Sequence, residues 1–127
     1  MKTTGIVFGI IYLIIGILGL LATPLIGGAG YFVTNTAFDI INIIVGIIFL
    51  VVAFKGAAGV AMTSKIIGII YVLLAIIGFF TVSAGATGSV LGFIDANGAT
   101  NWLNLILGII VLAFGFKKSE GGAAEQM

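Results

Sequence analysis

The sequence predicts an all-α integral membrane protein, a four-helix bundle made of two duplicated helical hairpins that run parallel to each other. Three observations lead to this prediction. The 127 residues are 61% hydrophobic and only 7% charged, with a mean hydropathy of +1.40, whereas soluble domains carry about 25% charged residues. The apolar residues form four blocks of membrane-spanning length. The second pair of blocks repeats the first.

The four apolar blocks are predicted to be membrane spans at residues 5–22, 37–54, 66–82 and 102–116. At about 1.5 Å per residue, each helix reaches about 23–27 Å, slightly short of a hydrocarbon core of about 30 Å. Backbone amides need partners inside lipid, so these blocks must be helices. No Ala-x-Ala cleavage signal follows the first block, and we therefore expect it to be retained rather than removed as a signal peptide.

The chain is predicted to be one transmembrane domain that covers residues 1–127. The first hairpin repeat takes residues 5–55 and the second takes residues 66–117. Residues 56–64 are expected to form the loop between them. The polar, glycine-containing stretch 118–127 is expected to be a flexible tail.

The charged residues predict the orientation of the spans. The two internal acids, Asp39 and Asp95, fall at one side of a four-pass chain. All lysines fall at the other side: Lys2, Lys55, Lys65, Lys117 and Lys118. Because lysines near span ends stay on the cytoplasmic side, we expect both termini to be cytoplasmic, in a prokaryotic cytoplasmic membrane. Residues 23–36 and 81–101 are then expected to face outward.

The repeat is visible in two aligned pairs of segments. "GIIYLIIGILGL" (9–20) and "GIIYVLLAIIGF" (68–79) are identical at six of twelve positions, at an offset of 59 residues. "DIINIIVGIIFLVVAFK" (39–55) and "NWLNLILGIIVLAFGFK" (101–117) are identical at eight of seventeen, at an offset of 62. An even number of spans returns the chain to its starting side, so both hairpins are expected to point the same way, around an axis along the membrane normal.

Small residues recur at heptad spacing in each span and are expected to be the helix-packing positions. In lipid, helices associate through close contact at small residues, and heptad spacing keeps those residues on one face. The positions are Gly9, Gly16, Gly46, Ala53, Gly68, Ala75, Gly108 and Gly115. We expect this small-residue surface to exceed what one bundle core needs, which would leave some of it for partners.

A short polar column is expected near the outer end of the second and fourth spans. It consists of Asp39 and Asn42 in one repeat and of Asn101 and Asn104 in the other. Buried polar groups in membranes often mark a substrate or ion site. They also serve as links between helices, worth typically about 0.6 kcal/mol each. The second interpretation is favoured here.

The two asparagines of the column are neutral and occupy equivalent positions. Asn42 and Asn104 are therefore expected to bond to each other or to facing carbonyls. A direct bond between Tyr12 and Asn42 is not expected, because Tyr12 lies nearer the cytoplasmic end and its side chain points further that way.

The composition argues against several kinds of chemistry. The chain has no cysteine, histidine or arginine, so the usual ligands for metals and the commonest general base are missing. Its acids are only Asp39, Asp95, Glu120 and Glu125. A carboxylate in mid-span, as rotary-ATPase proteolipids and small multidrug exporters need, is absent. The sequence therefore predicts no enzyme activity, no cofactor, no metal and no nucleic-acid partner.

The segment "NGATNWLNLILGIIVLAFG" (97–115) resembles the closing segment of an uncharacterised family of small four-helix prokaryotic membrane proteins, known only as a domain of unknown function. The family pattern there is Asn-x-Ala-Asp-Asn-x-Leu-His-Leu-x-x-Gly. Thr100 stands at its Asp and Asn104 at its His; the matching positions are Asn97, Ala99, Asn101, Leu103, Leu105 and Gly108. The second span resembles the family's other Asn-x-x-His-Leu segment, with Asp39 and Asn42 in those places. The resemblance implies a fold and no activity.

Two functions follow as expectations. The first is a non-catalytic membrane protein, a structural or accessory subunit that packs in the lipid bilayer against itself or a larger membrane complex. The alternative is a small channel or transporter that uses the Asn42/Asn104 pair at the axis between the repeats.

Overall fold

The computed structural model describes residues 2–28, 30–82, 88–90 and 92–125. The chain forms four helices: α1 (Lys2–Leu20), α2 (Thr36–Lys55), α3 (Ala57–Thr81) and α4 (Gly98–Glu125). Each contains a stretch of 19–24 residues that is apolar enough to cross a membrane. At about 1.5 Å per residue these stretches cover about 28–36 Å, which matches a hydrocarbon core of about 30 Å. The prediction of an all-α, multi-pass membrane protein is confirmed.

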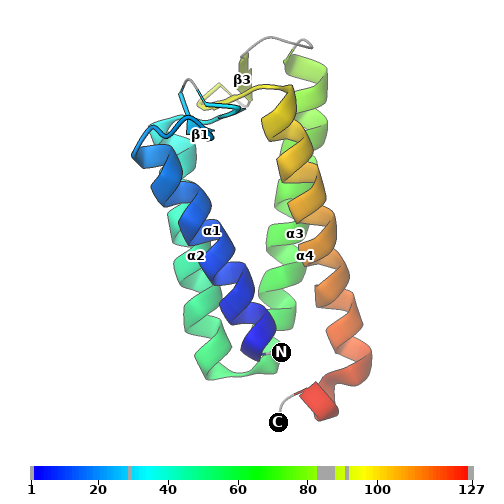
Figure 1. Ribbon diagram of the computed structural model, residues 1–127. Helices are drawn as coiled ribbons and strands as arrows, with labels where there is room; N and C mark the ends of the chain where they lie inside the picture. The colour runs from blue at the N-terminus through cyan, green and yellow to red at the C-terminus, as the bar shows by residue number, and fades with distance from the viewer. Residues whose placement is uncertain (1, 29, 83–87, 91, 126–127) are drawn as a thin grey trace.

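The helices are arranged as two hairpins that stand side by side (Figure 1). α1 packs along α2 in hairpin 1, and α3 packs along α4 in hairpin 2, while fewer contacts, mostly between α2 and α3, join the hairpins. Both termini lie at one end of the bundle, and the strands lie at the other. The origin of the hairpins by duplication stays a prediction.

The connection between the hairpins is much shorter than predicted. The expected loop over residues 56–64 is wrong, because α3 already begins at Ala57 and only Gly56 separates it from α2. Gly56 has a φ of +147°, a conformation that favours glycine. Small and polar residues give this stretch the composition of a loop, but Val60 is fully buried and packs with Ala53. Tertiary contact therefore extends the helix.

The helices also begin earlier than the apolar blocks do. Asn35 Oδ1 accepts a hydrogen bond from the Phe38 amide at 3.0 Å and caps α2. Asn97 Oδ1 accepts one from the Thr100 amide at 2.9 Å, and α4 begins at Gly98 rather than at 102. At its other end α4 continues to Glu125, into the stretch predicted as a tail, whose flexibility stays a prediction.

Both loops at the strand end contain short ladders that the sequence analysis did not predict. β1 (Ile26–Gly27) and β2 (Phe32–Val33) pair in parallel. β3 (Gly88–Val90) and β4 (Ile94–Ala96) form an antiparallel ribbon. These ladders give backbone amides partners where the chain leaves the helices. They also fold both loops over the end of the bundle (Figure 1).

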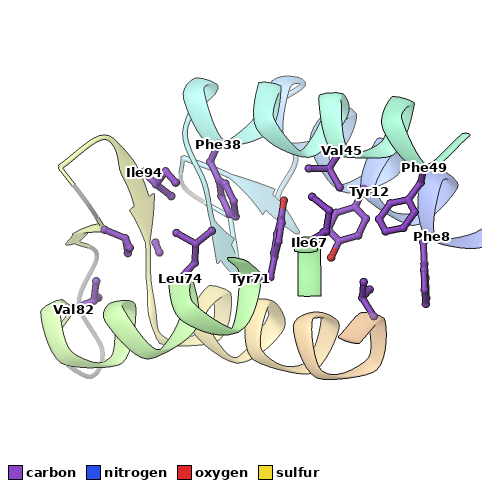
Figure 2. Packing of buried hydrophobic residues seen from close by; sticks show 13 residues of the cluster. Phe8, Tyr12, Phe38, Val45, Phe49, Ile67, Tyr71, Leu74, Val82 and Ile94 are labelled. Atoms are coloured by element: carbon purple, nitrogen blue, oxygen red, sulfur yellow. The ribbon is translucent and has the colours of Figure 1, made fainter. Parts of the chain in front are cut away.

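The core between the hairpins is aromatic (Figure 2). The Tyr12 ring stacks on Phe49 with a centroid separation of 6.0 Å and meets the edge of Tyr71 at 5.0 Å. Phe8 packs on Phe49 at 5.5 Å, and Phe38 lies 6.2 Å from Tyr71. Rings from α1, α2 and α3 thus fill the space along the contact of the two hairpins.

The outward faces of all four helices are apolar. Exposed isoleucine, leucine, valine and tryptophan side chains recur at helical spacing, as expected for a surface in contact with lipid. Examples are Ile10, Ile14 and Ile17 in α1, Ile40, Ile44 and Val51 in α2, Ile66, Ile69 and Leu73 in α3, and Trp102, Ile106 and Ile109 in α4.

Candidate functional site

The small residues singled out in the sequence lie at the helix contacts within each hairpin. A Cβ on Gly46 would lie 2.7 Å from the carbonyl oxygen of Gly9, and one on Gly108 would lie 3.0 Å from that of Gly68. These distances leave no room for a side chain. All the named positions are buried: Gly9, Gly16, Gly46, Ala53, Gly68, Ala75, Gly108 and Gly115. Their surface is consumed inside the hairpins, and the expectation that some of it remains for partners is wrong for these residues.

Asp39 and Asn101 occupy equivalent places in the two hairpins. A Cβ on Gly19 would overlap the Asp39 carboxylate, and one on Gly78 would overlap the Asn101 amide. Gly19 and Gly78 are 59 residues apart, and Asp39 and Asn101 are 62 apart, the same offsets that align the repeats. Each hairpin therefore seats a buried polar group directly on a glycine of its first helix.

The heptad pattern misses Gly19 and Gly78. Both are identical positions of the aligned segments, which is the signal that identifies them. Their role becomes visible only when the facing polar side chain is known.

Asn42 bonds to Tyr71, a pairing that the sequence analysis did not predict. The Tyr71 hydroxyl donates a hydrogen bond to Asn42 Oδ1, and both groups are buried. The expectation that Asn42 bonds to Asn104 or to a carbonyl is wrong for this oxygen. Reasoning within one hairpin cannot place Tyr71, because this bond joins α2 of hairpin 1 to α3 of hairpin 2.

The remaining residues of the interior are buried without such a bond. Asn104 is 4% exposed on α4. Among the described residues, the Tyr12 hydroxyl, the Asn42 amide nitrogen and both amide atoms of Asn101 are buried and have no hydrogen-bond partner. The Tyr12 hydroxyl does not bond to Asn42, and the two tyrosines at equivalent positions thus differ in their bonding.

Two asparagines join the loops at the strand end. Asn35 Nδ2 donates to the carbonyl oxygen of Phe93 at 2.8 Å, and Asn97 Nδ2 donates to that of Tyr31 at 2.9 Å. Both asparagines and both acceptors are 62 residues apart. We call these four residues the loop clasp. It links the hairpins reciprocally, since each asparagine caps a helix of its own hairpin and holds the loop of the other.

Further bonds reinforce the second half of the clasp. Asn97 Oδ1 lies 3.3 Å from the Val33 amide nitrogen, which donates to it. The buried Thr100 hydroxyl donates to the carbonyl oxygen of Val33 at 2.7 Å. Thr100 stands at the aspartate of the family pattern. The sequence marks the two asparagines of the clasp, because the Asn-x-Ala of residues 35–37 returns at residues 97–99, but it does not show which carbonyls they bind.

In the part of the chain that the structure describes, no three histidine, cysteine, aspartate or glutamate side chains gather where they could hold a metal ion. The polar side chains of this site tie helix to helix and loop to loop.

Comparison with protein-family models places most of the chain in one family. The family model described as Domain of unknown function (DUF4383) matches residues 2–117. The chain belongs to this family. The match covers all four spans and the clasp, and it agrees with the resemblance found in residues 97–115. No curated protein and no solved structure gives a significant match. The detailed family pattern and the prokaryotic origin stay predictions.

Proposed function

We propose that this DUF4383 protein is a non-catalytic membrane component, a structural or accessory subunit that packs against itself or a larger membrane complex. The main support is that the chain's own side chains fill its interior. Aromatic rings occupy the space between the hairpins, and the buried bonds there and in the loop clasp tie parts of the chain to one another. Among the described residues, the apolar outward faces of the four helices are exposed and available to other molecules.

Cysteine cross-linking in native membranes tests this proposal. The chain has no cysteine of its own, so single cysteines at the exposed positions Ile14, Ile44, Leu73 and Ile106 each report on one helix face. We expect one or two of these faces to cross-link to a second copy or to one defined partner. The buried Val111 serves as a control that should not react. A protein that cross-links at none of the faces and conducts solutes in liposomes would contradict the proposal.

The alternative, a small channel or transporter, has one observation in its favour. The amide nitrogen of Asn42 and both amide atoms of Asn101 are buried without a partner among the described residues, and such groups in a membrane often mark a solute path. The test is solute flux in liposomes with the double variant N42L/N104L. Loss of flux supports transport, whereas unchanged flux with lower thermal stability assigns the asparagines to helix association.

For the localisation, we propose a prokaryotic cytoplasmic membrane with both termini in the cytoplasm. The support is that both termini share one end of the bundle and that four of the five lysines flank span ends on that side, namely Lys2, Lys55, Lys117 and Lys118.

A further inference from the structure

The net charge of +1 hides a strong separation of charge along the bundle. Asp39 lies in the first turn of α2 and Asp95 in β4, both at the strand end. The lysines lie toward the end that carries the termini: Lys2, Lys55, Lys65, Lys117 and Lys118. At that end α4 also carries Glu120 and Glu125. Lysines therefore outnumber glutamates by five to two there.

Each hairpin places a lysine over an exposed phenylalanine at this end. The ammonium of Lys2 in α1 lies 4.7 Å from the centroid of the Phe54 ring in α2. That of Lys65 in α3 lies 5.1 Å from the centroid of the Phe116 ring in α4. Both distances fall within the range of cation–π attraction. Phe54 and Phe116 are equivalent positions of the repeat, and they are 68% and 57% exposed.

The depth of the Lys65–Phe116 pair fits the boundary between acyl chains and headgroups. Lys65 lies eight residues into α3, about 12 Å from its start, and its neighbours Met62 and Ile66 are exposed apolar residues. Helical side chains lean toward the helix N-terminus, which for α3 is the end that carries the termini. The ammonium of Lys65 thus reaches toward headgroup level, while the Phe116 ring beside it stays exposed to acyl chains.

We propose that the two lysine–phenylalanine pairs bind anionic phospholipids. The ring face attracts the ammonium and fixes it at the surface, and the N–H groups that remain free donate to a headgroup phosphate. The exposed ring contacts the acyl chain of the same lipid. Lys55 follows Phe54 directly in the chain, and Lys117 and Lys118 follow Phe116, so further lysines stand next to each phenylalanine in the sequence. This inference does not depend on the proposed function.

The test compares lipid retention by the full chain reconstituted in phosphatidylcholine alone and in phosphatidylcholine mixed with phosphatidylglycerol. Native mass spectrometry counts the phosphatidylglycerol molecules that stay bound. One lysine near an anionic surface strengthens binding by about fivefold, so the double variant K2Q/K65Q should weaken relative retention by up to about 30-fold. K2R/K65R should retain it, because arginine keeps the charge and the attraction to the ring.

Two further variants separate specific sites from general charge. D95N changes the net charge by one unit, as K2Q does, but it raises the charge and acts at the opposite end of the bundle. It should leave the retention of phosphatidylglycerol unchanged. F54L/F116L keeps the lysines and the apolar surface, and it should lower retention by a smaller factor than K2Q/K65Q does. Retention by K2Q/K65Q equal to that of the unchanged chain would overturn the proposal. Equal retention of phosphatidylcholine and phosphatidylglycerol by the unchanged chain would overturn it as well.

Discussion

Tyr12 and Tyr71 occupy equivalent positions of the two hairpins, and their hydroxyl groups have different surroundings. Tyr71 donates to Asn42, whereas the Tyr12 hydroxyl is buried without a partner among the described residues. The two rings touch edge to face at 5.0 Å. Each serves as the control for the other, because the substitution to phenylalanine removes one oxygen from nearly the same place.

We expect Y71F to lower the free energy of unfolding by about 1 kcal/mol, since it removes a buried bond and leaves Asn42 Oδ1 unpaired. Y12F should be neutral or stabilising, because it removes an unpaired buried hydroxyl. Thermal unfolding in one detergent measures both. A larger loss in Y12F than in Y71F would contradict the hydrogen-bond assignment.

The glycines beneath Asp39 and Asn101 lead to a second prediction at this scale. A methyl group at Gly19 or Gly78 would overlap the facing polar group, and such overpacking costs about 1–3 kcal/mol. G59A is the matched control, because its Cβ would meet Val52 at an ordinary 3.5 Å, and alanine in a helix is favoured over glycine by about 0.5–1 kcal/mol. If G78A is lowered in stability, G78A/N101A should recover part of the loss.

At the scale of elements, the residues that cap the helices also join the two hairpins. Asn35 caps α2 and Asn97 caps α4, and the amide nitrogen of each holds a carbonyl in the loop of the other hairpin. Each asparagine side chain thus makes one bond to its own helix and another to the loop of the other hairpin. The other end of the bundle has a covalent link instead, the single residue Gly56.

We expect N97A to lower the free energy of unfolding by about 2–3 kcal/mol, because it removes a cap worth about 1 kcal/mol and further bonds of about 1 kcal/mol each. N97D keeps the capping oxygen and loses the donor to Tyr31, so its loss should be smaller. T36A changes an exposed position in the first turn of α2 and should have little effect. An equal loss in N97A and N97D would assign the whole effect to the clasp bond.

The junction between the hairpins carries its own prediction. A Cβ at Gly56 would meet nothing within 4 Å, yet its φ of +147° disfavours any other residue. G56A should therefore cost about 1–3 kcal/mol through backbone strain alone. G98A, which also meets nothing within 4 Å and has no positive φ, should cost less. Thermal unfolding of both variants separates strain from steric overlap.

At the scale of the whole molecule, the distribution of charge distinguishes the same two ends of the bundle as the path of the chain does. Both termini and the lysine–phenylalanine pairs lie toward one end, and the two internal acids lie at the other, Asp39 at the start of α2 and Asp95 in β4. The hairpins are held together at both ends and along the aromatic core between them.

The orientation is tested with single cysteines at Ala58 and Ser89, both exposed and at opposite ends. With both termini cytoplasmic, an impermeant maleimide should label S89C in intact cells, and A58C only after lysis. Labelling of A58C in intact cells would reverse the orientation and place the clasp inside the cell.

The sequence by itself determined the four helices, their membrane environment and the positions of close helix contact, because each depends on local composition and on periodicity within one span. It could not determine which residues of different elements contact each other. The Tyr71–Asn42 bond, the seats of Asp39 and Asn101 on Gly19 and Gly78, the clasp and the helical start of α3 each join residues from different elements. Their geometry exists only once the hairpins have packed, since a side chain finds its partner in three dimensions.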